Sequence, residues 1–155
     1  MAALNDKFDV LRGWEPGGDA SVDQSFRPVQ VMGVPVTLLP GYIVAINSST
    51  EVDVATSPAD VTLGTADPLQ AYVVIEGNGD DFSARFVDKV VCLRGKLTVR
   101  TDKLDIGSAF PVTGAVTFSS GLLADKAAGD TTQQVGTVIG NNVAVDGTIT
   151  VELDL

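Results

Sequence analysis

Short β-branched runs, each ended by glycine, proline or another turn residue, are the feature that most constrains the fold of this chain. Runs of this kind are typical of strands, whereas a doubly wound α/β fold needs long amphipathic segments between strands, and those are missing. The pattern predicts a mainly β fold, either an antiparallel β-sandwich or a small β-barrel. The expected strands are 34–39, 42–47, 71–76, 89–93, 96–101 and 111–118, with Arg94-Gly95 separating the fourth from the fifth.

The closing segment, QVGTVIGNNVAVDGTITVELDL (residues 134–155), has the clearest period. From Thr148 to Leu155 polar and apolar residues alternate strictly, which predicts a strand with one face in the core and the other in solvent. Asp146-Gly147 is a dipeptide that tolerates the positive φ angles of a tight hairpin, so VAV (143–145) is the expected partner strand. With a second turn at 140–142, the segment predicts a three-stranded antiparallel meander.

Helical signals are sparse, and at most one or two short helices are expected. Residues 122–128 (LLADKAA) favour one or two helical turns, and residues 80–86 could form helix or strand. Residues 1–30 have no sustained period and predict an extended N-terminal arm, followed by a single β-rich domain at 31–155. Phe8, Leu11 and Trp14 are the apolar anchors of that arm, since they would be costly to leave in water. They are expected to pack on their own domain or on a neighbouring subunit.

The residue inventory closes most routes to catalysis. The chain has no histidine, which removes the commonest general base and metal ligand, and its one cysteine, Cys92, lies in an apolar run and is expected to be buried. No nucleophile elbow, phosphate loop or dinucleotide fingerprint is present. We therefore expect no enzyme activity, no cofactor, no metal and no small-molecule substrate.

Two acidic patterns leave narrow alternatives. A pair among the 20 Asp and Glu residues could serve glycosidase chemistry, although solvation of turns and strand faces explains these acids. Glu76, Asn78 and Asp80 are spaced two apart, as in calcium loops, but the distal glutamate of such a loop is missing. A glycine-rich turn is the favoured interpretation.

Charge and hydropathy exclude two classes of partner. The formal net charge of −10 is unfavourable for gripping phosphates, so no nucleic acid partner is expected. The apolar runs are far shorter than the ~20 residues that span a bilayer, and the first residues lack the apolar stretch of a secretory signal. We expect no membrane partner and a chain made and kept in a cytoplasm.

Six of the ten basic residues fall between positions 85 and 103, where only two acids oppose them. This segment has a net charge of +4, and the rest of the chain carries −14. Alternation predicts that Lys96, Thr98 and Arg100 share one face, forming a basic stripe. The stripe either protects an edge strand from aggregation or docks an acidic partner. The candidate docking residues are Arg94, Lys96, Arg100 and Lys103.

The succession VTLLPGYIVAI, KVVCLRGKLTVRTDKLD, FPVTGAVTF and the closing segment resembles the capsid decoration (cement) proteins of tailed bacteriophages. The resemblance covers most of residues 30–155 and rests on the succession of strand and turn sequences. It implies a structural virion protein, made in the host bacterial cytoplasm, that binds the exterior of an assembled head and stabilises it. It also implies a homotrimer whose partner is the major capsid protein, with the N-terminal arm engaging the shell.

Three other classes remain open from the residues. The first is another virion β-protein, such as a tail-tube, fibre or connector component. The second is a carbohydrate-binding or adhesion module, for which the single tryptophan is a poor fit. The third is the carboxylate-based enzyme described above.

Overall fold

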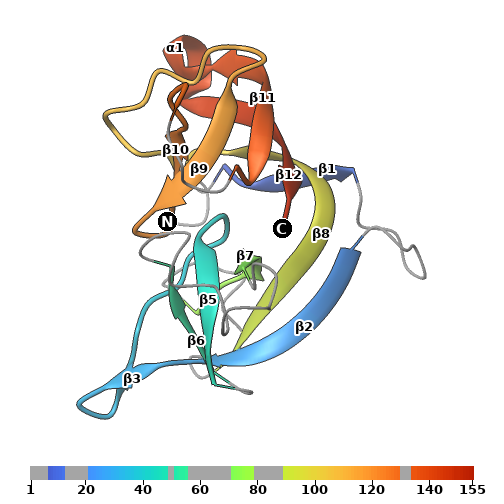
Figure 1. Ribbon diagram of the computed structural model, residues 1–155. Helices are drawn as coiled ribbons and strands as arrows, with labels where there is room; N and C mark the ends of the chain where they lie inside the picture. Colours follow the sequence, from blue (N-terminus) through green and yellow to red (C-terminus); the bar gives the residue numbers. More distant parts are fainter. Residues whose placement is uncertain (1–6, 13–20, 49–50, 56–70, 79–88, 130–133) are drawn as a thin grey trace.

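The computed structural model describes residues 7–12, 21–48, 51–55, 71–78, 89–129 and 134–155. This part of the chain is mainly strand with one short helix, as the sequence predicts, and its large sheets are mostly antiparallel (Figure 1). The elements are β1 (Asp9–Arg12), β2 (Ser21–Pro28), β3 (Gln30–Val31), β4 (Val34–Pro35), β5 (Ile43–Ser48), β6 (Glu51–Val54), β7 (Ala71–Glu76), β8 (Val90–Thr101), β9 (Ala115–Ser119), β10 (Leu122–Asp125), β11 (Gly136–Asn142), α1 (Val143–Asp146) and β12 (Thr148–Asp154).

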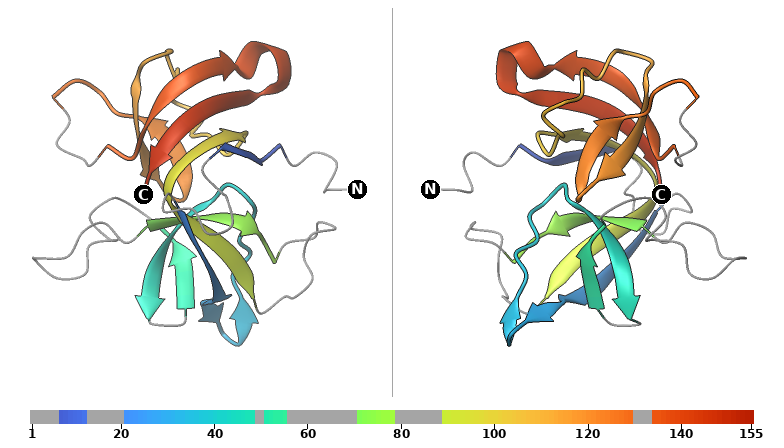
Figure 2. Two further views of the ribbon diagram at one scale, coloured as in Figure 1. Left: turned by 90° about the vertical axis from the view of Figure 1, so that its right-hand side faces the viewer. Right: turned by 60° about the vertical axis from the view of Figure 1, so that its left-hand side comes forward.

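The long strand β8 joins the two halves of the molecule (Figures 1 and 2). Its first half pairs with β2 and β7, and its second half pairs with β1 and β12. Between them lies Gly95, whose φ of 124° is disfavoured for residues with a side chain. The expected break at Arg94-Gly95 is therefore wrong: Gly95 lies inside one continuous strand.

The first half is a closed circuit of strands, here called the barrel half. Strand β8 is followed by β2, β6, β5 and β7, and β7 pairs again with β8. Among these five described strands, only the pairing of β2 with β6 is parallel. Alternate residues of these strands form a compact core that contains Phe26, Tyr72 and Cys92, with the two aromatic rings in edge contact at 5.1 Å between centroids.

The second half, here called the sheet half, has the strand order β10–β9–β11–β12–β8. Its outer strand β10 is covered by the segment that continues β8: Leu123 N donates to Lys103 O (3.1 Å) and Asp105 N donates to Leu123 O (2.8 Å). The larger core lies inside this half and includes Phe110 and Phe118. It also takes in residues from the second faces of β5, β7 and β8, so the two halves are packed together in a sandwich-like arrangement.

The closing meander differs from the prediction. Residues 143–145 form part of α1 rather than a strand, and β11 extends through 140–142, where a turn was expected. Asn142 is paired directly with Thr148, so two strands flank a single helical turn. Gly147 does adopt the positive φ expected of it (79°), but as the residue that ends α1. The predicted core face of 148–155 is confirmed, since the residues at 149, 151, 153 and 155 are buried. Thr148 departs from the predicted solvent face, because it is also buried, at 1% exposure.

Three further expected elements need correction. Residues 122–125 are strand β10 instead of helix, because Ser120-Gly121 forms a tight turn that pairs β10 with β9. Within 34–39 and 111–118, strand is limited to Val34–Pro35 and to the part from Ala115 onward. Residues 80–86 lie outside the described residues.

The N-terminal segment is extended, but in the described residues it is not an arm separate from the domain. Strands β1 and β2 both pair with β8, and β2 does so along six residues, from Ser21 opposite Gly95 to Phe26 opposite Val90. Phe26 is buried at 3% exposure in the barrel core. The polar sequence of β2 concealed this strand, which is formed by pairing with β8 rather than by its own period.

Candidate interaction surfaces

The three predicted anchors of the N-terminal segment have different positions. Phe8 packs against the larger core, and its ring lies so close to Gly41 that an added Cβ there would be 3.1 Å from Phe8 Cδ2. Leu11 is 56% exposed on β1. Trp14 lies outside the described residues. Phe8 thus packs on its own domain, as one of the two alternatives predicted.

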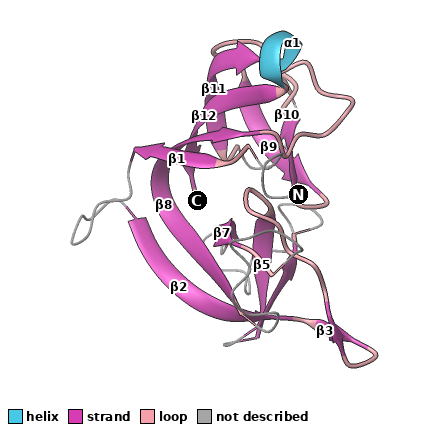
Figure 3. Cartoon of the chain, turned by 180° about the vertical axis from the view of Figure 1, so that it is seen from behind, coloured by secondary structure: helices cyan, strands magenta, loops and turns pink. Residues whose placement is uncertain are grey.

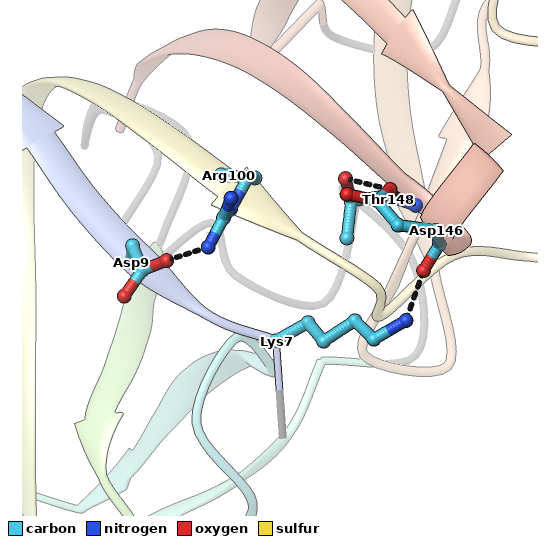
Figure 4. Close-up of polar contacts among 5 residues, drawn as sticks. All are labelled: Lys7, Asp9, Arg100, Asp146 and Thr148. Atoms are coloured by element: carbon cyan, nitrogen blue, oxygen red, sulfur yellow. Dashed lines mark hydrogen bonds and ion pairs between the residues drawn. The ribbon is translucent and has the colours of Figure 1, made fainter. Parts of the chain in front are cut away.

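Besides the backbone pairing of β1 with β8, two side-chain contacts tie residues 7–9 to the rest of the chain (Figure 4). Arg100 forms an ion pair with Asp9, and the Lys7 ammonium donates to the main-chain oxygen of Asp146. The Asp146 carboxylate accepts hydrogen bonds from Thr148 N (3.0 Å) and Thr148 Oγ1 (2.6 Å). The Thr148 hydroxyl bond is the main cause that lowers the pKa of Asp146. Lys7 therefore links the N-terminal segment to the end of α1.

The predicted basic stripe has the expected alternation, because Leu97, Val99 and Thr101 are buried while Lys96 is exposed. Its surroundings contradict the edge-strand interpretation. Strand β8 is paired on both sides in this region, so the stripe does not lie on an edge strand. The neighbouring strands place acidic residues beside it: Asp154 is opposite Lys96, Glu152 is opposite Thr98, and Asp9 is paired with Arg100.

The other predicted docking residues also interact within the chain. The guanidinium carbon of Arg94 lies 5.9 Å from the centre of the Tyr72 ring, a cation–π contact. Lys103 Nζ is 2.7 Å from Asp102 Oδ1, with both side chains mostly buried. The structure thus brings Lys96 and Arg100 together on one face, but surrounds them with carboxylates. A uniformly basic docking surface is not formed by the described residues.

Several polar side chains hold the chain's own backbone. Asp125 accepts from Ala109 N (2.6 Å) and Phe110 N (3.0 Å), and Asn141 Nδ2 donates to the carbonyl of Phe110 (2.9 Å). These bonds fix Phe110 at a positive φ of 51° with its ring buried in the core. Asn78 has a similar role in the barrel half, since its side chain bonds Leu38 N (2.7 Å) and Val36 O (2.9 Å).

The candidate metal-ligating and nucleophilic residues do not form a catalytic or metal site in the described part of the chain. No group of three or more metal-ligating side chains is found there. Asn78 bonds the backbone instead of joining a calcium loop, and Asp80 lies outside the described residues. Burial raises the pKa of the Cys92 thiol to about 12, so this thiol is protonated at neutral pH. Within the described residues, no helix is long and apolar enough to span a membrane.

Five of the nine exposed large apolar side chains in the described residues lie at the two ends of the molecule, and sequence reasoning missed them. At one end the β3–β4 hairpin carries Val31, Met32 and Val34, which are 60, 98 and 65% exposed. At the other end, around α1, Val143 and Val145 are 45 and 86% exposed. Figures 1 and 3 show the β3–β4 hairpin projecting from the end opposite α1. The signal available in the sequence was VQVMGVPV, an apolar stretch around a Met-Gly turn without any charge.

Comparison of the chain with protein-family models, with curated proteins and with solved structures finds no match.

Proposed function

We propose that this chain is a structural virion protein that binds the outside of an assembled phage capsid and stabilises the shell. The observation that carries the proposal is the location of exposed apolar side chains at both ends of an otherwise acidic molecule. Exposed apolar patches mark surfaces that are covered in an assembly. The sequence resemblance to phage decoration proteins supplies the class of assembly.

The arrangement of polar groups supports a structural role. Asp125, Asn141 and Asn78 direct their hydrogen bonds to the chain's own backbone, where they fix loops. The larger core continues from the sheet half into the faces of β5, β7 and β8, so the two halves share one core. A body with exposed apolar side chains at both ends can tie neighbouring subunits of a shell together.

Copies of the chain on one shell would act together. We extend the proposal to a homotrimer, in which three weak contacts bind the shell by avidity. Static light scattering tests this part separately: a mass about three times the 16.1 kDa of the chain is expected. The mass of a monomer would contradict the trimer but not the proposed binding to the capsid.

The main test is co-sedimentation of the purified chain with heads that lack their decoration protein. Saturable binding to the exterior, with raised resistance of the heads to heat, is the expected result. A chain that stays in the supernatant at all concentrations would overturn the proposal. Rings or tubes of the chain in electron micrographs would favour a tail or connector component instead.

The basic stripe provides an internal comparison in the same assay. Reversal of Lys96 and Arg100 to Glu slows association and weakens its salt dependence if the stripe contacts the shell. Because Asp9, Glu152 and Asp154 surround the stripe, we expect a change of less than about threefold in the association rate at physiological salt. A larger decrease would assign the docking contact to the stripe.

A further inference from the structure

The tip of the β3–β4 hairpin has an unfavourable backbone conformation that its own chain does not compensate. Met32 and Gly33 have φ angles of 52° and 81°, the two positive values of a type I′ turn. Glycine and asparagine suit these positions, whereas methionine is disfavoured there. Met32 is also 98% exposed, so packing within the chain does not offset its conformation. An unfavourable residue kept without internal benefit is a sign of a function outside the chain.

A second hairpin with the same turn has a tip that packs against its own chain. Ser120 and Gly121, between β9 and β10, have φ angles of 49° and 80°. Gly121 N donates to Ala55 O and Gly121 O accepts from Ile43 N, each at 2.8 Å, so this tip is docked on the barrel half. Around Gly33, by contrast, no atom of the described residues lies within 4 Å of the position of an added Cβ.

The base of the β3–β4 hairpin is held firmly. Val29 N donates to Val52 O (3.0 Å), and Val36 N donates to Val29 O (2.9 Å). Asn78 Nδ2 then donates to Val36 O (2.9 Å), which fixes the strand that leaves the hairpin. The tip therefore projects in a defined direction and would lose little conformational freedom on binding.

The chemistry of the hairpin differs from that of the body that carries it. Val31 and Val34 are cross-strand partners beside Met32, and all three are exposed. No charged residue occurs from Pro28 to Thr50, although the chain carries a net charge of −10. An uncharged apolar tip fits an apolar pocket of another protein. The acidic body is repelled by anionic membrane surfaces.

We propose that the β3–β4 hairpin is a finger that inserts Met32 into an apolar pocket on the exterior of the shell protein. This inference rests on the proposed function and names the contact by which the chain binds. Val31 and Val34 cover the rim of the pocket. The flexible thioether of Met32 fills the pocket itself, as methionine does at adaptable interfaces.

The test is a titration of undecorated heads with the full chain and with Met32→Asn. Asparagine tolerates the positive φ, so the variant keeps the turn and its melting temperature is expected to be unchanged or higher. Its affinity for the heads is expected to fall about ten- to hundredfold, because the buried methionine contact is lost. The double variant Val31→Thr with Val34→Thr, which keeps the β-branched shape, is expected to show a smaller loss. Binding of the unmodified chain should persist in about 1 M NaCl, where charge contacts are screened.

Ile106→Thr is the matched control, since this side chain is 99% exposed in the segment that follows β8. It is not expected to change the affinity. If Met32→Asn binds the heads as tightly as the unmodified chain, the finger is wrong and the proposed function stands. If the unmodified chain does not bind at all, both are overturned. A further outcome is that the unmodified chain floats with phosphatidylglycerol vesicles and Met32→Asn does not. The hairpin would then bind a lipid surface, and the proposed protein pocket would be wrong. A drop from oligomer to monomer mass in Met32→Asn would do the same in favour of a second copy.

Discussion

Two hairpins of this molecule have the same two-residue turn and different surroundings. Ser120-Gly121 carries a small polar residue at the first position and is hydrogen bonded to the barrel half through Ile43 and Ala55. Met32-Gly33 carries a large apolar residue at that position and extends beyond the barrel half. The comparison teaches that turn geometry sets only the shape of a hairpin tip, since the same turn is docked on the barrel half in one hairpin and exposed in the other.

The largest effect is expected from removing β2, the strand that precedes the β3–β4 hairpin, because neither hairpin can be compared in a barrel half that no longer folds. Deletion of residues 1–28 removes β1 and β2, and with β2 the strand that pairs with both β6 and β8. We expect loss of cooperative unfolding, since the barrel circuit is opened and Phe26 leaves its core. Thermal melts followed by circular dichroism provide the measurement. Deletion of residues 1–6, which leaves both strands in place, is the control. A sharp melt in the longer deletion would mean that the rest of the chain folds without β2.

The two turn glycines form a direct comparison. An added Cβ at Gly121 would lie 2.7 Å from Val54 Cγ1, whereas at Gly33 it meets nothing within 4 Å of the described residues. Both alanines carry the cost of a positive φ, about 1–2 kcal/mol. Gly121→Ala adds an overlap worth about 1–3 kcal/mol. Urea unfolding is expected to rank Gly121→Ala well below Gly33→Ala in stability. Equal losses would mean that the β9–β10 tip is not tightly docked.

The polar residues near the two hairpins allow a milder test. Asn78→Ala removes the bonds to Val36 and Leu38, and Asp125→Ala removes the bonds to Ala109 and Phe110. Each leaves backbone groups without their partner, at a cost of about 1–3 kcal/mol in the free energy of unfolding. Asn78→Ala is also expected to weaken binding to heads by loosening the finger, and Asp125→Ala is not. Glu152→Ala, at an exposed position of β12, serves as the neutral control for stability.

The hairpin that contains α1 is expected to give the smallest effect, seen in its pH dependence. Because the pKa of Asp146 is lowered in the folded chain, its ionised form stabilises the fold at pH values above the ordinary aspartate range of about 4. That contribution is lost as the pH falls through the lowered pKa. Melting temperatures of the unmodified chain and Asp146→Asn, measured from neutral pH downward, are expected to converge in acid. Thr148→Val should reduce the difference, since it removes the hydroxyl that donates to Asp146. A constant gap at every pH would contradict this assignment.

Much of the fold could be predicted from local pattern. The alternation of Thr148–Asp154 and of Lys96–Thr101 identified the buried faces correctly, because a strand with one side in the core must have that period. What local pattern could not provide was the partner of each strand. The continuity of β8 through Gly95, and the strand at Leu122–Asp125 where a helix was expected, both depend on pairing with other segments. In the closing hairpin, one helical turn replaced the expected strand because β11 pairs directly with β12.

The candidate surfaces were harder to predict for the same reason. The face shared by Lys96 and Arg100 followed from the sequence, but the carboxylates beside it come from Asp9 and Asp154, which are distant in the chain. Exposure of Val31 and Met32 depends on where the hairpin leaves the barrel half, and no period in VQVMGVPV determines that. The available clue was the absence of charge around a Met-Gly turn, which a search for reactive residues does not examine.

The central position of β8 has a consequence for how the chain folds. Its first partners, β1 and β2, precede it in the sequence, whereas β12 follows it after an interval that includes β9, β10 and β11. Contacts between segments so far apart are slow to form, because a long loop must close before they provide any stabilisation. During synthesis, the edge of β8 from Lys96 to Thr101 is therefore available to other chains until β12 arrives. The charges of Lys96 and Arg100, which have acidic neighbours in the finished fold, would then protect that open edge from pairing with the wrong strand.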